Sequence, residues 1–303
     1  MAHARFVYAP DYYCDVGSHV FRTEKYRLLY EKMLQAGLAK PEEFLVPPPA
    51  TRDQLELVHT REYIRDLYTY RHTARTVRSE MPISRQIVEA FVLGAGGSIL
   101  ACRVAAREKT MTMNLAGGFH HAFADWAEGF CYINDVAVAV RAVQAEGLFE
   151  RAMVVDCDLH QGNGTAHIFR DDATVFTFSI HHENNYPLIK RQSDLDVGLP
   201  DYCSGEVYLA ALRENLLPAL DRQGPELVVY VAGADPYEKD RLGLLLLSTE
   251  DLRRRDDLVL GACADRRIPV AALLAGGYAP DVRDTVQIHY GTACSLVEHA
   301  RLL

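Results

Sequence analysis

The sequence predicts an α/β fold in a single domain, with a mostly parallel central β-sheet and helices on both of its faces. Two observations predict this class. Apolar, strand-like runs alternate with longer helical patterns along most of the chain, which is typical of proteins built from successive strand–helix units. No linker-like break separates these elements over 303 residues, of which 49% are hydrophobic, so we expect residues 1–303 to share one large core.

The first third of the chain is predicted to be mainly helical. The segment Glu24–Gln35 has apolar residues on one helical face, and Gly37 follows it as a stop signal. The longest helical pattern contains three closely spaced glycines, which indicate a close packing contact rather than a phosphate loop. The predicted elements are a strand at Phe6–Tyr8, helices at Glu24–Gln35, Arg52–Val58 and Glu62–Tyr70, a loop at His72–Pro82 and a helix at Ser84–Arg107.

In the remaining two thirds, strand and helix alternate. One long stretch, His181–Cys203, reads as irregular because it is rich in Asn, Gly and Pro, and loops of this length in a compact domain are usually functional. We interpret His181 and His182, at its start, as solvated or rim-lining. The predicted strands are Met111–Leu115, Ala152–Val155, Thr174–Ile180, Leu227–Val231 and Ile268–Leu274, and the predicted helices are Asn134–Glu146, Thr165–Phe169, Glu206–Leu220, Glu250–Ala264 and Asp281–Ala300.

Composition excludes several classes of function. The net charge is −9 and the Lys and Arg residues are dispersed, so direct nucleic-acid binding is not expected. No apolar run approaches the roughly 20 residues that span a bilayer, and the first residues lack the apolar segment of a signal peptide. Seven scattered cysteines indicate free thiols rather than a disulfide framework. We therefore expect a cytoplasmic protein, whose oligomeric state the sequence does not indicate.

Four polar clusters each follow an apolar, strand-like run. The carboxyl ends of parallel strands gather at one edge of a sheet, where ligands bind, so we expect these clusters to meet. Together they supply two adjacent imidazoles, an Asp-x-His pair, a further carboxylate and a phenol. This set suits a mononuclear metal hydrolase. The clusters are Gly117–His121, Asp156–His160, Ala232–Asp235 and Gly276–Tyr278.

The candidate metal ligands are Asp158, His160 and Asp235. The first two are two residues apart, so on an extended segment they project to the same side. Three protein ligands leave a position for water, as in catalytic zinc sites, although an oxygen-rich set also suits Fe²⁺. Taken alone, an Asp-x-His pair is more often a turn or a hydrogen-bonded pair, and Asp235 alone suits a helix cap or a turn. Convergence of the strand ends favours metal binding.

Adjacent imidazoles at His120 and His121 are costly to bury unless each has a polar partner. One of them is then suited to move a proton while the other stays oriented or charged near the metal. Asp156 and Asn163 are candidate partners that would fix their tautomers. The competing interpretation is a pair of ordinary surface histidines.

Tyr278 follows two glycines, which allow a sharp backbone turn toward a pocket. A phenol there can donate a hydrogen bond to a developing oxyanion without competing for the metal. A lone Gly-Gly-Tyr is more often a turn with a core aromatic, but its place after the last core strand favours function.

The chain closely resembles the histone deacetylase family, and its bacterial and class IV members in particular, over nearly its whole length. That resemblance implies the arginase/deacetylase-like fold. The motifs that carry it are Val58-His59-Thr60 before Tyr63, Gly117–His121, Gly129–Asp135, Asp156–Gly164, Phe178–His181, Asp194–Pro200, Gly233–Asp235, Asp240–Gly243 and Gly276–Tyr278.

The resemblance implies a zinc-dependent lysine deacylase. Its substrate would be an acyl-lysine protein or peptide carrying an acetyl or longer fatty acyl group, which a metal-bound water attacks. The ligands would be the three residues named above, with Zn²⁺ or Fe²⁺ as the ion. His121 would be the main general base and acid, His120 paired with Asp156 its electrostatic helper, and Tyr278 the group that polarises the carbonyl.

The resemblance also implies structural K⁺ ions and an acyl-lysine tunnel. One K⁺ site would use Asp156, Asp158, His160, Ser179 and the backbone of Ile180; a second would fall near Phe169, Asp172 and Val175. The residues implied for substrate binding are Gly129 and Phe130 on one wall, Tyr186 on the opposite wall, Leu242 and Gly277.

Two positions depart from related patterns and bear on the alternatives. Asn163 stands where class I members have an aspartate, so the shuttle histidine would be less basic. Leu242 stands where the family's polyamine deacetylase has a glutamate, which argues for an apolar acyl-lysine. The alternatives are a small-molecule deacetylase such as an acetylpolyamine amidohydrolase, a two-metal ureohydrolase that would want acids at Asn163 and Pro236, and a catalytically inactive acyl-lysine binder.

Overall fold

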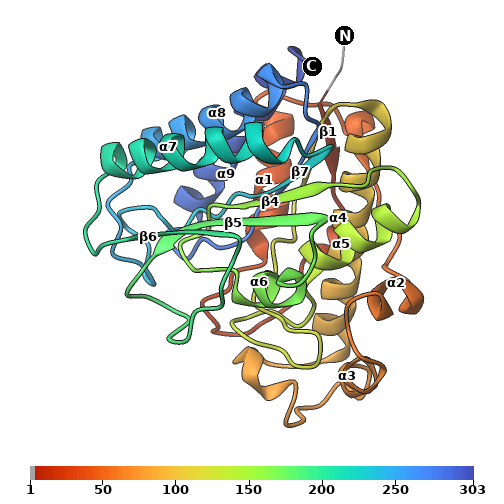
Figure 1. Ribbon diagram of the computed structural model, residues 1–303. Coiled ribbons are helices and arrows are strands. Elements are labelled where there is room, and N and C mark those ends of the chain that lie inside the picture. The colour runs from red at the N-terminus through yellow and green to blue at the C-terminus, as the bar shows by residue number, and fades with distance from the viewer. Residues whose placement is uncertain (1–3) are drawn as a thin grey trace.

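The computed structural model describes residues 4–303, and they form an α/β fold around one eight-stranded sheet (Figure 1). The strand order is β2-β1-β3-β8-β7-β4-β5-β6, and each strand pairing is parallel. The predicted fold class is therefore confirmed. The strands are β1 (Arg5–Val7), β2 (Phe44–Leu45), β3 (Met111–Asn114), β4 (Ala152–Asp156), β5 (Val175–His182), β6 (Leu195–Leu199), β7 (Leu227–Val231) and β8 (Val270–Leu273).

Two helical layers cover the sheet. Helices α1, α9, α8 and α7 pack side by side on one face, and α4, α5 and α6 cover the other (Figure 1). The central strands β3, β4, β7 and β8 are buried along their whole length, as expected for a parallel sheet between helices. The helices are α1 (Glu24–Gln35), α2 (Arg52–Glu56), α3 (Arg61–Leu67), α4 (Arg85–Glu108), α5 (Asp135–Ala145), α6 (Asn163–Phe169), α7 (Gly205–Gln223), α8 (Thr249–Asp265) and α9 (Val282–Ala300), with 3-10 turns at Pro10–Tyr12, Pro41–Glu43 and Val77–Ser79.

The long helix α4 is the core helix that its glycines predict. A Cβ at Gly97 would lie 2.0 Å from the hydroxyl oxygen of Tyr12, and one at Gly96 would lie 1.9 Å from the carbonyl oxygen of Pro48. These glycines therefore allow close packing, as predicted. By length and composition α4 is the one described helix apolar enough to cross a membrane, but 67% of its most apolar window is buried against the fold. A membrane span is therefore not plausible.

Hydroxyl caps explain why the helix starts are predictable. Ser84, Ser204 and Ser248 precede α4, α7 and α8, and each side chain accepts a hydrogen bond from a backbone N–H in the first turn. The segment His72–Pro82 is a loop with one 3-10 turn, and Glu24–Gln35 has the predicted bounds.

The segment after β5 differs from its prediction as an irregular stretch. Strand β5 continues through His182, and β6 lies inside the expected loop, while β2 was not predicted. β6 is an edge strand whose Gly198 and flanking Pro200 conceal its alternating pattern. The interpretation of His181 and His182 as solvated is wrong, because each residue is only 1% exposed.

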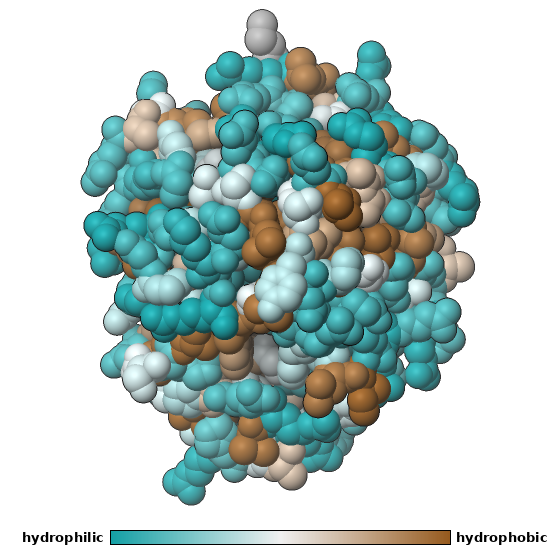
Figure 2. All heavy atoms as spheres, turned by 90° about the vertical axis from the view of Figure 1, so that its left-hand side faces the viewer, coloured by the Kyte–Doolittle hydropathy of each residue, from teal (hydrophilic) through white to brown (hydrophobic). Residues whose placement is uncertain are grey.

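The interior and the surface agree with the composition. All seven cysteines are free, and six of them are buried. On the face in Figure 2, apolar side chains occur in small groups among hydrophilic ones. This pattern is typical of a surface that faces solvent.

Candidate active site

Four neighbouring strands deliver the site, because β3, β8, β7 and β4 are adjacent in the sheet. His120 and His121 follow β3, the Asp158–His160 segment follows β4, Asp235 follows β7 and Tyr278 follows β8. All of these side chains are buried. The structure therefore brings together the four polar clusters that the sequence places at strand ends.

The three candidate metal ligands point at one another. The Nδ1 atom of His160 lies 3.1 Å from Oδ1 of Asp158 and 3.2 Å from Oδ2 of Asp235. One ligand atom from each residue falls within 4.8 Å of the others. Atoms bound about 2.0 Å from a tetrahedral zinc ion lie roughly 3.3 Å apart, so this spacing suits one shared ion.

The hydrogen bonds of the two carboxylates leave an oxygen free for a cation. Asp158 accepts the backbone N–H of Gly276 at 2.8 Å through Oδ2, and Asp235 accepts that of Leu159 at 3.0 Å through Oδ1. The other oxygen of Asp235 is buried and accepts no hydrogen bond from the described residues. Burial and the neighbouring Asp158 raise the pKa of Asp235 to about 6. A divalent cation would relieve this crowding of charge, so the residues fit a metal ion.

A buried arginine holds together the two segments that carry the candidate metal ligands Asp158 and Asp235. Arg255, on α8, is fully buried and donates through Nη1 to the carbonyl oxygens of Cys157 at 3.2 Å and Gly233 at 2.6 Å. It also pairs with Asp256 at 2.8 Å. It thus joins the segments that carry Asp158 and Asp235. Sequence reasoning missed it, although its helical spacing from the buried Leu252 was a usable signal.

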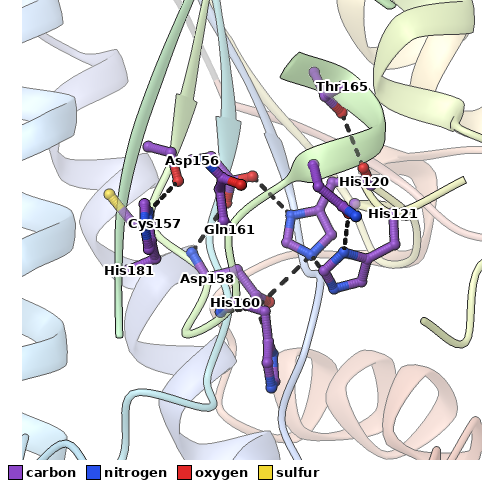
Figure 3. A network of polar contacts seen from close by, with 12 residues as sticks. His120, His121, Asp156, Cys157, Asp158, His160, Gln161, Thr165 and His181 are labelled. Atoms are coloured by element: carbon purple, nitrogen blue, oxygen red, sulfur yellow. Dashed lines mark hydrogen bonds and ion pairs between the residues drawn. The ribbon is translucent and has the colours of Figure 1, made fainter. Parts of the chain in front are cut away.

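Each histidine of the pair has a separate partner, and Figure 3 shows His120 facing Asp156 with His121 beside it. Nδ1 of His120 lies 2.7 Å from Oδ2 of Asp156, and Nδ1 of His121 lies 2.8 Å from Oδ1 of Asn163. The two Nε2 atoms are 3.1 Å apart, so one of them donates to the other. The partners expected from the sequence are the ones present, and the interpretation as surface histidines is wrong.

The surrounding charges shift the pKa values of the two imidazoles in opposite directions. Burial opposes a charge on His120, but Asp156 and Asp158 outweigh it and raise the pKa of His120 to about 9. Burial, together with the charge of His120, lowers the pKa of His121 well below its usual value. His120 is therefore the cationic donor through Nε2, and His121 the neutral acceptor.

The loop that carries the histidines is anchored by the start of α5. The carboxylate of Asp135 accepts the backbone N–H groups of Phe119 at 2.6 Å and Gly118 at 3.1 Å. The side-chain amide of Asn134 donates to the carbonyl oxygen of His120 at 3.3 Å. These side chains fix the turn that precedes and carries the imidazoles.

A pocket of about 180 Å³ opens onto His121, His160 and Tyr278. Burial and the nearby Asp235 raise the pKa of Tyr278 far above its usual value, so its phenol stays protonated. The pocket is lined by Glu80, His121, Gly129, Phe130, His160, Asn185, Tyr186, Leu242 and Tyr278.

Four of the five residues implied for substrate binding line this pocket, namely Gly129, Phe130, Tyr186 and Leu242. Gly277 does not line the pocket within the described chain. A Cβ there would lie 2.6 Å from Cγ2 of Thr285, and its φ of +142° favours glycine, so it belongs to the turn that carries Tyr278.

Sequence reasoning missed three residues around the pocket. Glu80 and Asn185 lie in loops without a periodic pattern and line it. Asp240 accepts the backbone N–H groups of Tyr278 at 2.6 Å and Leu242 at 2.9 Å. Asp240 thereby connects the turn that carries Tyr278 to the pocket wall formed by Leu242. Its position in the Asp240–Gly243 motif was a sequence signal for this role.

The residues implied for K⁺ lie in two places. Asp156, Asp158, His160, Ser179 and Ile180 lie on or just after β4 and its neighbour β5, and the hydroxyl of Ser179 is 2.9 Å from Nδ1 of His181. Phe169 ends α6, Val175 begins β5, and Asp172 lies in the turn between them, where its carboxylate pairs with Arg141. K⁺ binding at either place stays a prediction.

Comparison with known proteins places these features in a family context. Residues 19–292 match the family model described as the histone deacetylase domain. An uncharacterised protein of the cyanobacterium Picosynechococcus is 42% identical over 93% of this chain and 95% of its own length. Histone deacetylase 2 of Arabidopsis thaliana is 29% identical over 86% of this chain and 70% of its own. The crystal structure of the HDA15 HD domain shares the fold, with a TM-score of 0.82 and 23% identity over 96% of this chain and 90% of that one.

Proposed function

The chain belongs to the histone deacetylase family of hydrolases, and on that premise we propose that it removes acyl groups from the Nε atom of lysine in proteins or peptides. One observation carries the proposal. A buried Asp-His-Asp cluster, a neutral imidazole and a protonated phenol converge at one pocket. These groups are what amide hydrolysis by an activated water requires.

The metal would be held by Asp158, His160 and Asp235, whose spacing and free carboxylate oxygen suit it. Zn²⁺ is the ion we propose, with Fe²⁺ as the alternative, and structural K⁺ remains part of the proposal. When bound, the divalent ion supplies Lewis acidity and lowers the pKa of water.

The protein side chains would then move the protons. His121, neutral and with Nε2 unprotonated, accepts a proton from the attacking water. His120, kept cationic by Asp156, places its positive charge beside His121 and stabilises negative charge in the site. The phenol of Tyr278 donates to the oxygen of the former carbonyl as charge develops there. His121 returns its proton to the departing lysine amine.

The pocket walls favour the neutral side chain of an acyl-lysine over a cationic chain. Phe130, Tyr186 and Leu242 present apolar surface to the methylene groups of acyl-lysine. Glu80, which also lines the pocket, is the observation that favours a second candidate function, deacetylation of a cationic polyamine. Its carboxylate is largely exposed, so salt screens its attraction for a cation.

The test is a panel of lysine peptides carrying acyl chains from acetyl to myristoyl, with acetylspermidine, assayed with Zn²⁺ or Fe²⁺. We expect an acyl-lysine peptide to give a kcat/KM at least tenfold above that of acetylspermidine. The opposite ranking would favour the polyamine deacetylase. A metal-loaded protein that binds acyl-lysine peptide but hydrolyses none of the panel would be the inactive binder instead.

A further inference from the structure

We propose that Glu128 is a positioning residue that selects the tautomer of His121 by orienting the amide of Asn163. This inference deepens the proposed function and rests on it, because it concerns the imidazole that accepts the proton. Glu128 itself does not touch that imidazole through any hydrogen bond of the described residues; it acts through Asn163.

The contacts form a chain of two short hydrogen bonds. Oδ1 of Asn163 lies 2.8 Å from Nδ1 of His121, and Nδ2 of Asn163 donates to Oε1 of Glu128 at 2.7 Å. The second oxygen of Glu128 accepts from Nε1 of Trp126 at 2.9 Å. Asn163 is buried, and the Glu128 side chain is only 16% exposed, so water competes little for these bonds.

The chemistry of a carboxylate fixes the direction of this chain. An ionised carboxylate only accepts hydrogen bonds, so the NH₂ group of Asn163 must face Glu128. The amide oxygen then faces His121 and can only accept, so the proton of His121 stays on Nδ1. Nε2 is left unprotonated, and its single lone pair faces the N–H of His120 in the resting site. This nitrogen must carry no proton of its own if His121 is to act as a base.

Without the carboxylate, the amide of Asn163 is free to turn by 180°. Its NH₂ group would then face Nδ1 of His121 and favour the other tautomer, with the proton on Nε2. That tautomer cannot act as a base toward the pocket. Glu128 therefore supplies at a distance the orientation that a carboxylate next to the histidine would supply directly.

The loop holds Glu128 in place for this role. Backbone hydrogen bonds run in both directions between Glu128 and Cys131, at 3.2 and 2.9 Å. The next residue, Gly129, has a φ of +50°, and a Cβ there would lie 2.6 Å from Cδ2 of His121. Glycine at that position lets the turn approach the imidazole closely enough for Glu128 to reach Asn163.

The first experiment is independent of turnover. Long-range ¹⁵N–¹H spectra of ¹⁵N-histidine-labelled, zinc-loaded protein report which ring nitrogen of His121 carries the proton. We expect the proton on Nδ1 in the wild type and a mixture or the Nε2 form in Glu128→Ala. Glu128→Gln should weaken the preference for Nδ1–H, since its single amide oxygen must serve either Asn163 or Trp126. Asp125→Asn, which removes an exposed carboxylate of the same loop, is the matched control and should behave as wild type. A proton that stays on Nδ1 in Glu128→Ala would overturn the inference.

The second experiment separates orientation from a structural role. On an acetyl-lysine peptide we expect Glu128→Ala to lower kcat about tenfold with KM within twofold, at unchanged zinc content. In an Asn163→Asp background, the new carboxylate faces Glu128, so Glu128→Ala should raise kcat or leave it unchanged. Equal losses in both backgrounds would mean that Glu128 only supports the loop. A wild type without activity but with the expected spectra would refute the proposed function and leave this inference standing.

Discussion

Two imidazoles in one sequence motif have pKa values shifted in opposite directions because their Nδ1 atoms meet different partners. His120 faces the carboxylate of Asp156, and His121 faces the amide of Asn163. An acceptor with full charge stabilises an imidazolium, whereas an amide oxygen fixes a tautomer with little change in charge. The roles that we propose for these two histidines thus depend on single partner atoms rather than on residue type.

Replacing Tyr278 by Phe removes the donor to the developing oxyanion and leaves the ring packing intact. We expect kcat to fall by about 10²–10³, the effect of losing one oxyanion donor. KM and zinc stoichiometry should change little, because the phenol does not ligate the metal in this proposal. Full activity of the metal-loaded variant would refute the assignment. Tyr290→Phe, which removes a phenol hydroxyl on α9 outside the pocket lining, is the matched control and should keep the wild-type kcat.

Replacing His59 by Gln tests a pH dependence of stability. His59 is buried, and burial lowers its pKa to about 4. Its unfolded-state pKa is about 6.5, so the unfolded chain binds more protons between these values and stability falls as pH falls through this window. Between pH 7.5 and 5, this group alone should remove about 2 kcal/mol from the free energy of unfolding.

Urea unfolding of the wild type and His59→Gln at both pH values gives the measurement. The variant should be less stable at pH 7.5 but lose less on acidification. His72→Gln replaces an exposed histidine and is the control. The free energy of unfolding of this variant should change with pH as it does in the wild type. If the wild type and His59→Gln lose the same free energy of unfolding on acidification, His59 does not contribute to the pH dependence of stability.

At the level of elements, helix starts hold the functional loops. Asn134 and Asp135, at the start of α5, bind the turn that carries the histidines, and Thr165 of α6 donates its N–H to the carbonyl oxygen of His120 at 3.0 Å. A loop alone would not hold two imidazoles in one orientation. Rigid helices on one face of the sheet therefore set the geometry of a site built on strand ends.

Replacing Asp135 by Asn should disturb this anchor. The carboxylate accepts from Gly118, Phe119 and the hydroxyl of Ser98, and an amide would turn an NH₂ group toward one of these donors. We expect a loss of about 2–4 kcal/mol in unfolding free energy and a lower kcat in the folded protein. Denaturant unfolding and activity of Asp265→Asn, at an exposed helix end, provide the control. An unchanged Asp135→Asn protein would contradict the anchoring role.

For the whole molecule, strand order decides that the site exists at all. The segments that carry His121 and Tyr278 are far apart in the sequence but follow the adjacent strands β3 and β8. The metal ligands follow β4 and β7, which are also adjacent. Binding of an ion across these strand ends links distant parts of the chain, so it should stabilise the fold as a whole.

Removal of the metal tests this coupling. Zinc at 100 times its Kd should add about 2.7 kcal/mol, which corresponds to a Tm shift of order 5 °C for a domain of this size. Chelation should reverse the shift in a thermal melt. Asp235→Asn should remove most of the dependence on zinc. A wild type whose Tm is the same with zinc and with chelator would argue against the site.

Much of the fold was predictable, because periodicity and caps act locally. Helix α1 and strand β7 have the predicted bounds, and the serine caps of α4, α7 and α8 mark their starts. The prediction fails at β2 and β6, which lie at the two edges of the sheet. Short edge strands gain their stability from a single neighbour, so their own sequence carries a weak signal.

The sequence by itself determined the fold class, the family and the candidate site residues that the structure brings together, because those depend on residue types at fixed local spacings. Only the tertiary structure decided the links between segments far apart: Arg255 beneath the ligands, Asp240 behind Tyr278 and the chain from Glu128 to His121. Such contacts depend on distances across the sheet and between loops. A linear pattern does not contain those distances, since folding alone sets them.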